Sequence, residues 1–133
     1  MEWEEELVLR NRILKFDKNF IYKLMIDISN KLQKYSKKYK VDLNICCIPG
    51  DYINIVGRIN IHIQFILNDT LLIIKLNNPN DIYIKIYIKD YYYYIEYNNL
   101  PSENNNLNKE VYFLDKDLFS KILKDLLILN NKF

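Results

Sequence analysis

The sequence contains no alanine and has only two glycines and three prolines among its 133 residues. Two glycines are too few for the glycine-rich loops that cradle phosphates, which excludes a Walker loop and a dinucleotide-binding fingerprint. Ile, Asn, Lys and Tyr are abundant instead, and their codons are rich in A and T, whereas the scarce residues need G or C. We infer that the gene comes from an AT-rich genome, as found in many viruses, phages and low-GC bacteria.

Residues suited to catalysis or metal binding are also scarce, because His62 is the one histidine and Cys46 and Cys47 are the two cysteines. Adjacent strand residues point to opposite faces, so the two thiols cannot hold one metal ion together. We interpret residues 53–67 as one long strand bent at Gly57, which places Cys46 about 26 Å from His62 along an extended chain and excludes a Cys-His nucleophilic pair. The sequence predicts no catalytic residue, no metal and no cofactor.

Long apolar runs are missing as well, although half of the residues are hydrophobic. No run approaches the roughly 18 residues that a membrane-spanning helix needs. The first residues, MEWEEELVLRNR, are acidic before they are apolar, the reverse of a secretion signal. These features predict one intracellular globular domain over residues 1–133, with no membrane partner.

Two segments have the apolar spacing of amphipathic helices. In the first, which Asp17 or Asn19 can cap, the stripe consists of Ile21, Leu24, Met25, Ile28, Leu32, Tyr35 and Tyr39. Lysines crowd its far end, where they suit the helix dipole; a nucleic-acid patch is the less favoured interpretation. The second helix follows Asp115, and its stripe consists of Leu118, Phe119, Ile122, Leu123, Leu126 and Leu129. Residues 7–16 are compatible with a short helix or an added strand.

The middle of the chain alternates between apolar and polar residues with the period of a β-strand. A loop at residues 49–51 places Cys47 opposite Ile53. Two-residue turns at Asn68-Asp69 and Lys89-Asp90 give further cross-strand pairs: Phe65–Leu72, Ile63–Ile74, His62–Lys75, Ile86–Tyr93, Ile84–Ile95, Tyr87–Tyr92, Lys85–Tyr94 and Tyr83–Glu96. All three connections agree on one apolar face, which predicts an antiparallel meander.

The predicted fold is therefore α+β, with a five- or six-stranded antiparallel meander and both amphipathic helices packed on one face. An asparagine-rich loop over residues 98–109 precedes a short strand near residues 110–114. The strand 91–97 has a single formal charge, so we expect its edge to be paired by residues 110–114, a second subunit or a partner chain.

The segment IYIKIYIKDYYYYIEY suggests a binding surface on the sheet face away from the helices. The candidate partner-binding residues are Tyr83, Lys85, Tyr87, Tyr92, Tyr94 and Glu96. Such a surface suits a protein interface, where tyrosine is enriched, or single-stranded nucleic acid, whose bases stack on aromatic rings. The formal net charge of +2 is low for a phosphate-binding protein. Codon bias that supplies good strand formers is a third explanation.

A second candidate interface consists of Ile66, Leu71 and Ile73, which are apolar at positions where the alternation calls for polar residues. We expect something to cover them: the first 16 residues, including Trp3, Leu7 and Leu9, or else a second copy or a partner. The sequence favours a small non-enzymatic interaction protein, an inhibitor or adaptor from a virus or mobile element, acting through its sheet face, edge strand or loops. The alternatives are a single-strand nucleic-acid binder and a structural subunit of a larger assembly.

Overall fold

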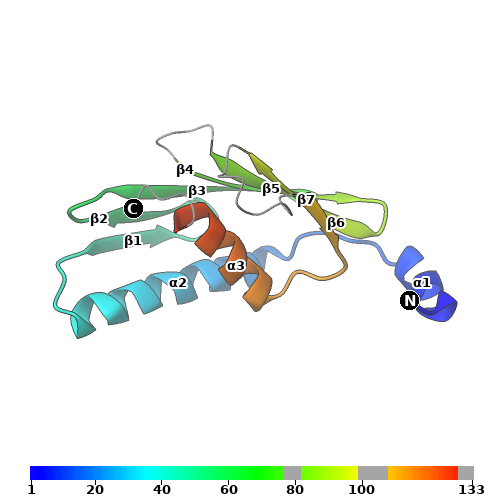
Figure 1. Ribbon diagram of the computed structural model, residues 1–133, viewed down its shortest axis with the longest axis horizontal. Helices are drawn as coiled ribbons and strands as arrows, with labels where there is room; N and C mark the ends of the chain where they lie inside the picture. Colours follow the sequence, from blue (N-terminus) through cyan, green and yellow to red (C-terminus); the bar gives the residue numbers. More distant parts are fainter. Residues whose placement is uncertain (77–81, 99–107, 129–133) are drawn as a thin grey trace.

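Seven strands form one antiparallel sheet and are ordered in space as they are in the sequence (Figure 1). They are β1 (Asn44–Ile48), β2 (Tyr52–Val56), β3 (Ile61–Leu67), β4 (Leu71–Leu76), β5 (Tyr83–Lys89), β6 (Tyr92–Asn98) and β7 (Asn108–Val111). This computed structural model describes residues 1–76, 82–98 and 108–128, except for the side chains of residues 108 and 109. Most of the predicted loop over residues 98–109, and Leu129 of the predicted helix stripe, lie outside the described residues.

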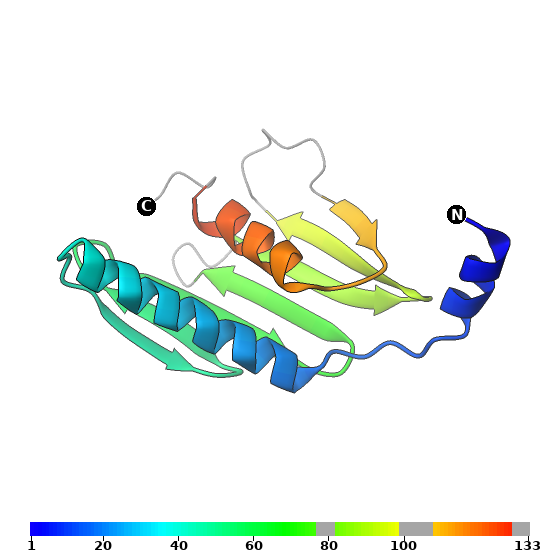
Figure 2. The ribbon, with the colours of Figure 1, turned by 90° about the horizontal axis from the view of Figure 1, so that it is seen from below.

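Two of the three described helices lie on the same face of the sheet, as the sequence predicts. Figure 2 looks onto this face and shows α2 (Lys18–Lys38) and α3 (Lys116–Leu127) crossing the strands. The Asp17 carboxylate accepts from the backbone N–H of Phe20 at 3.2 Å, and Asp115 accepts from that of Leu118 at 2.8 Å. Both aspartates are therefore N-caps. Within the described residues, no helix is both long and apolar enough to cross a membrane.

The hydrophobic core lies between the sheet and these two helices. From the strands, and from Ile82 just before β5, it takes Ile53, Ile55, Ile63, Phe65, Leu72, Ile74, Leu76, Ile82, Ile84, Ile86 and Ile95. From the helices it takes Ile21, Leu24, Met25, Phe119, Ile122, Leu123 and Leu126. The sequence alternation thus identified the core face correctly, and the α+β class with an antiparallel sheet is confirmed.

The prediction of a single strand over residues 53–67 is wrong. The chain reverses at Gly57, and β2 pairs with β3 in a hairpin that places Ile53 opposite Ile63. A Cβ at Gly57 would lie 2.5 Å from the end of the Leu43 side chain, so a larger residue there would displace that side chain. This reversal, together with the short β7, raises the strand number from the predicted five or six to seven.

Two predicted registers are also wrong, each by two residues, although the predicted faces are right. Phe65 pairs with Ile74 rather than Leu72, and Ile86 pairs with Ile95 rather than Tyr93. The first turn lies one residue later than predicted, at Asp69-Thr70: the Asn68 backbone N–H donates to the Leu71 carbonyl at 2.9 Å, and the Asn68 side chain accepts from the Thr70 backbone N–H at 2.9 Å. The second turn is at Asp90-Tyr91, where Asp90 adopts a positive φ of 58°. A shift of two residues preserves the face on which each side chain lies.

The predicted pairing of strand 91–97 is confirmed, because β6 pairs with β7 through Tyr93 opposite Val111 and Tyr94 opposite Glu110. The partner strand begins at residue 108, two residues before the predicted segment. The outer strands of the sheet are therefore β1 and β7. The tyrosine-rich β6 lies inside the sheet and is not an open edge.

A buried polar pair joins α3 to the sheet. The carboxylate of Asp125 is 5% exposed and accepts a hydrogen bond of 2.8 Å from the hydroxyl of Tyr97 on β6. Burial, with the neighbouring Asp125 carboxylate, raises the pKa of Tyr97, so the phenol keeps its proton and remains a donor. The pair satisfies an acidic group that would be costly to bury alone.

We expect Tyr97→Phe to lower the free energy of unfolding by about 1 to 3 kcal/mol, because the buried Asp125 loses a hydrogen-bond donor. Urea unfolding followed by circular dichroism measures this loss. Tyr94→Phe, which removes a hydroxyl from the same strand on the opposite face of the sheet, is the matched control and should change stability little. Equal unfolding midpoints for the two variants would contradict the role assigned to the pair.

Candidate functional site

The face of the sheet opposite α2 and α3 is covered by none of the described helices (Figure 1). We call it the open face. It carries the strand positions that alternate with the core residues, and most of their side chains are half-buried because neighbouring strands pack against them. Ile66, at 39% exposed, is among the more accessible apolar residues of this face.

Cross-strand pairing brings the two predicted interfaces together on the open face. Leu71 of β4 pairs with Tyr87 of β5, which pairs with Tyr94 of β6. In the next row Ile66 pairs with Ile73, followed by Lys85 and Glu96. We call the five residues Ile66, Leu71, Ile73, Tyr87 and Tyr94 the open-face patch. The sequence alone predicts these residues as parts of two separate surfaces.

The polar groups beside the open-face patch are engaged with one another. The Tyr87 hydroxyl donates to the Glu96 carboxylate at 2.9 Å, and this hydrogen bond raises the pKa of Tyr87. The Lys85 ammonium lies 5.1 Å from the centre of the Tyr87 ring. The rings of Tyr87 and Tyr94 stack on each other, with centroids 5.5 Å apart and planes inclined by 17°. The tyrosine surface is thus held in one arrangement by contacts within the chain.

Two of the predicted binding residues lie outside the two rows that carry the open-face patch. Tyr83 pairs with Lys75 and Asn98 in a different row of the open face, so the predicted pair Tyr83–Glu96 is wrong. Tyr92 pairs with Lys89 rather than with Tyr87, its predicted partner, but its ring lies edge-to-face against that of Tyr94, with centroids 6.2 Å apart. The predicted pair Lys85–Tyr94 is also replaced, by Lys85–Glu96 and Tyr87–Tyr94. These corrections all follow from the two-residue shift of the β5–β6 register.

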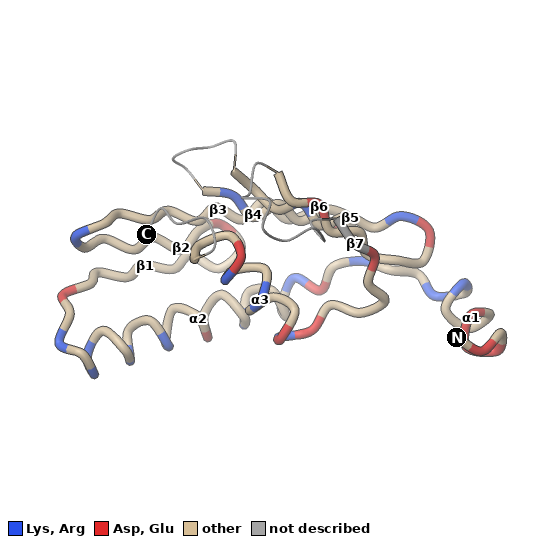
Figure 3. Tube along the Cα trace, viewed as in Figure 1, with Lys and Arg blue, Asp and Glu red and all other residues tan. Residues whose placement is uncertain are grey.

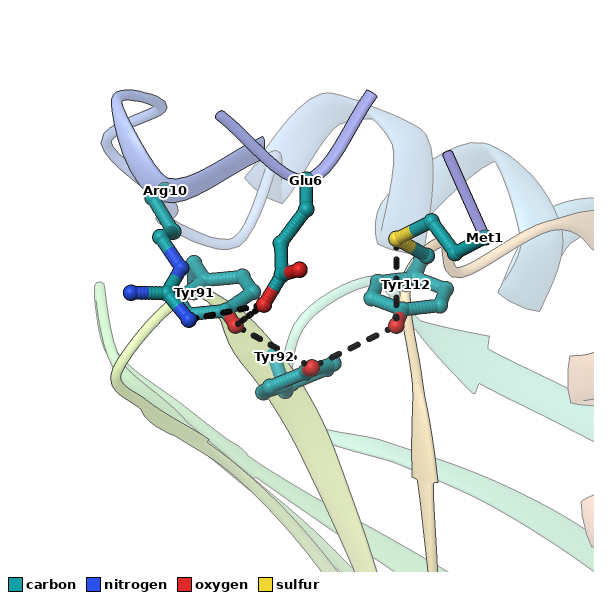
Figure 4. A network of polar contacts seen from close by, with 6 residues as sticks. All are labelled: Met1, Glu6, Arg10, Tyr91, Tyr92 and Tyr112. Carbon is teal, nitrogen blue, oxygen red and sulfur yellow. Dashed lines mark hydrogen bonds and ion pairs between the residues drawn. The ribbon is translucent and has the colours of Figure 1, made fainter. Parts of the chain in front are cut away.

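Tyr92 instead belongs to a tyrosine cluster that holds α1 (Trp3–Arg10) against the β5–β6 hairpin (Figure 4). Its hydroxyl lies 3.3 Å from the hydroxyls of Tyr91 and Tyr112, and these hydrogen bonds raise the pKa of Tyr92. The Tyr91 hydroxyl donates to Glu6 of α1 at 3.4 Å. Arg10 forms an ion pair with Glu6 at 2.7 Å and lies over the Tyr91 ring.

The segment between α1 and α2 is anchored to the same end of the sheet. The Arg12 guanidinium donates to the backbone carbonyl of Tyr91 at 2.7 and 3.2 Å. Phe16 is buried, and its backbone N–H donates to the carbonyl of Asp69 at 2.9 Å. These anchors direct α1 beyond the end of the β5–β6 hairpin, as Figures 1 and 2 show.

The expectation that the first 16 residues cover Ile66, Leu71 and Ile73 is therefore wrong. Leu9 is buried, but Trp3 and Leu7 remain 72% and 54% exposed. The acidic first turn and the i,i+4 pair Glu6–Arg10 are sequence signals typical of a helix. The docking position of α1 depends on Tyr91 and Tyr112, which are more than 80 residues away in the sequence, and no local pattern indicates it.

The separation predicted between Cys46 and His62 is also wrong, because of the reversal at Gly57. Both residues pair with Asn54, one from each side, so they lie in one row across three strands of the open face. The His62 Nδ1 lies 3.4 Å from the Asn54 side-chain oxygen, and the His62 ring stacks on Tyr52 with centroids 5.0 Å apart. The neighbouring Cys46 thiol raises the pKa of Tyr52. The thiol and the imidazole thus share Tyr52 and Asn54 as neighbours.

A search for acidic, cysteine and histidine side chains that could share a metal ion finds no group of three or more within the part of the chain that is described. Cys47 points to the core side, where burial raises the pKa of its thiol, while Cys46 is exposed. Comparison with protein families, with curated proteins and with solved structures finds no match. The function of this chain must therefore be inferred from its own residues.

Proposed function

We propose that this chain is a non-enzymatic interaction module that binds a partner protein through the open-face patch, as an inhibitor or adaptor. The observation that carries the proposal is the side-by-side placement of three aliphatic residues and two stacked tyrosines on the sheet face that the described helices leave uncovered. A contiguous apolar and aromatic surface with polar groups at its margin resembles the centre and rim of a protein interface.

The rigidity of the patch supports this proposal. Tyr87 is held by Glu96, Lys85 and Tyr94, so its rotamer is fixed before any partner arrives. A side chain that is already ordered loses little conformational entropy on binding, and the patch therefore retains more of its contact energy as affinity. Interface tyrosines of this kind are frequent hot spots.

Single-stranded nucleic acid is the second candidate, and the charges favour it less. Lys85 is paired across the strands with Glu96, and Glu110 of β7 lies opposite Tyr94. One ring face of Tyr87 and of Tyr94 is occupied by the other ring, which reduces the surface on which a base can stack. A phosphate backbone also needs several unpaired cations along one path.

The test places a photo-crosslinking amino acid at Tyr94 and, as a control, at Asn30 on the exposed side of α2. In lysate of the native host, we expect position 94 to capture one specific protein and position 30 not to capture it. With that protein purified, Tyr87→Ala should weaken binding by roughly 30-fold, the effect of a 2 kcal/mol hot spot. Val56→Ala, an exposed open-face substitution outside the patch, should leave binding unchanged.

Fluorescence anisotropy of labelled single strands tests the second candidate on the same variants. We expect no specific binding at physiological salt. Submicromolar binding there that weakens by roughly 1 to 3 kcal/mol in Tyr87→Ala and Tyr94→Ala would make nucleic acid the better proposal. A captured protein that binds Tyr87→Ala as tightly as the unchanged chain would contradict the patch as its binding surface.

A further inference from the structure

A second surface, separate from the open-face patch, is the outward side of α1. An α-helix turns by about 100° per residue, so Trp3 and Leu7 lie on one side of α1 with Val8 next to them. These three side chains are 72%, 54% and 71% exposed. The opposite side of the helix carries the buried Leu9, and Glu6, which contacts the tyrosine cluster, lies between Leu9 and Trp3 around the helix. We call Trp3, Leu7 and Val8 the α1 knob.

An apolar groove lies between α2 and α3 on the helix side of the molecule. Its lining includes Ile28, Leu32 and Tyr35 from α2 and Phe119 from α3, and its volume is about 240 Å³. Pockets that enclose whole small molecules measure roughly 300 to 1,000 Å³. This groove is smaller, so its size suits one or two inserted side chains. We call it the α2–α3 groove.

The charges around the knob and the groove are of opposite sign. Lys31 and Lys116 line the groove, together with one acidic residue, Asp27. Lys34 and Lys38 lie within about 6 Å of the Tyr35 ring at the same end of α2. Beside the knob, the sequence EWEEE places glutamates before and after Trp3. Figure 3 shows the acidic residues of α1 at one end of the molecule and the lysines of α2 along its lower side.

Most of the acidic residues of α1 and the lysines that line the groove form no ion pair within the described residues. Of the acidic residues of α1, only Glu6 forms an ion pair within the described residues. Lys31 and Lys116 likewise form none there, since the ion pairs found are Arg10–Glu6 and Lys18–Asp69. Contact between the two surfaces would pair these charges without breaking an existing bond.

The knob cannot reach the groove of its own chain while its anchors hold. Phe16 is fixed at Asp69, so only residues 11–15 remain free to span, a reach of about 17 Å. Arg12 uses part of that length to bind Tyr91. Figure 2 shows α1 and the groove-lining part of α2 on opposite sides of this anchored segment. An α1 knob that occupies the groove therefore comes from another copy of the chain.

We propose that the α1 knob of one copy docks in the α2–α3 groove of a second copy. Trp3 and Leu7 fill the apolar groove, and Glu4 and Glu5 approach Lys31 and Lys116. Knob and groove are different surfaces, so each copy offers one of each and two copies can satisfy both contacts by exchange. The open-face patch remains uncovered in such a pair, and its binding to a partner protein is independent of this contact.

Trp3 is the one tryptophan of the chain, so its fluorescence reports directly on the proposed contact. We expect acrylamide quenching of Trp3 to decrease, and its emission to shift to shorter wavelength, as the protein concentration rises from about 1 μM to 1 mM, a range that spans weak association. Sedimentation velocity should show a dimer forming over the same range. Higher salt should shift both transitions to higher concentration, because the pairing charges are screened.

Complementary variants test which surfaces meet. Trp3→Ala with Leu7→Ala should remove self-association, and Lys31→Glu with Tyr35→Ala should do the same; all four residues are exposed, so folding is preserved. A mixture of these two variants should form a 1:1 complex, because one still has a groove and the other still has a knob. Ile13→Ala, at a residue that is 95% exposed outside the knob, is the matched control and should associate like the unchanged chain.

Several outcomes would overturn the proposal. These are a chain that stays monomeric to 1 mM with constant Trp3 quenching, protection of Trp3 that does not depend on concentration, and a dimer that survives both pairs of substitutions. Failure of the mixed variants to form a complex would also overturn it, since two other surfaces would then be in contact. None of these results affects the test of the open-face patch, which uses Tyr87 and Tyr94.

Discussion

Replacing Ile86 with lysine is expected to unfold the protein. Ile86 is fully buried at the centre of β5, between Leu72 and Ile95, and its side chain packs in the core beneath the helices. An unpaired ammonium there loses its hydration without gaining a partner, and the cost of about 4 to 5 kcal/mol or more is comparable with the whole stability of a small domain. Circular dichroism and thermal melting measure the loss of the folded state.

Ile66→Lys is the matched control for this prediction. It makes the same chemical change on the neighbouring sheet region but on the open face, where Ile66 is 39% exposed. The lysine can keep its charge in water there, so this variant should melt close to the unchanged protein. A normal melting curve for Ile86→Lys would contradict the assignment of the two faces.

Phe119→Ala is expected to lower the free energy of unfolding by about 3 to 5 kcal/mol. Phe119 is 3% exposed and forms an edge-to-face contact with Phe20 across the two helices, with centroids 6.1 Å apart. Its removal leaves a cavity between α2 and α3, and the aromatic contact is lost as well. Urea unfolding with an unchanged m-value would show that the loss comes from the folded state.

Two further variants make the second prediction specific. Phe119→Leu keeps most of the volume and should cost clearly less than Phe119→Ala. Phe113→Ala removes a phenyl ring that is 68% exposed and should change stability little. If Phe119→Ala were as mild as Phe113→Ala, the helices would not depend on this contact.

Alternation along the chain was sufficient to predict which side chains face the core. Phe65 and Ile86 pair with residues two positions away from those predicted, yet both lie on the predicted face and are buried. The face depends only on odd or even position, a property that each strand carries locally. The helix caps Asp17 and Asp115 are local for the same reason, because each side chain binds a backbone N–H three residues ahead.

The turns could not be predicted with the same certainty, because their positions depend on single backbone angles. Asp90 adopts a positive φ, which moves the turn by one residue. As a result, Tyr87 pairs with Tyr94 and Lys85 pairs with Glu96, each two positions beyond the predicted partner. At Gly57, too, the local backbone conformation determines whether the chain continues as a bent strand or reverses into a hairpin. The same turn-forming residues are compatible with either turn position, and with a bend or a reversal at Gly57, so the sequence pattern does not distinguish these alternatives.

The sequence by itself therefore determined the class of fold, the core face and the starts of α2 and α3, all of which follow from short-range periodicity and capping chemistry. Only the tertiary structure decided what comes together on the surface: Leu71 beside Tyr87, Cys46 in one row with His62, and α1 held by Tyr91. These contacts join segments that are distant in the chain. Their formation depends on the summed packing and register of all the strands between them, which no local pattern records.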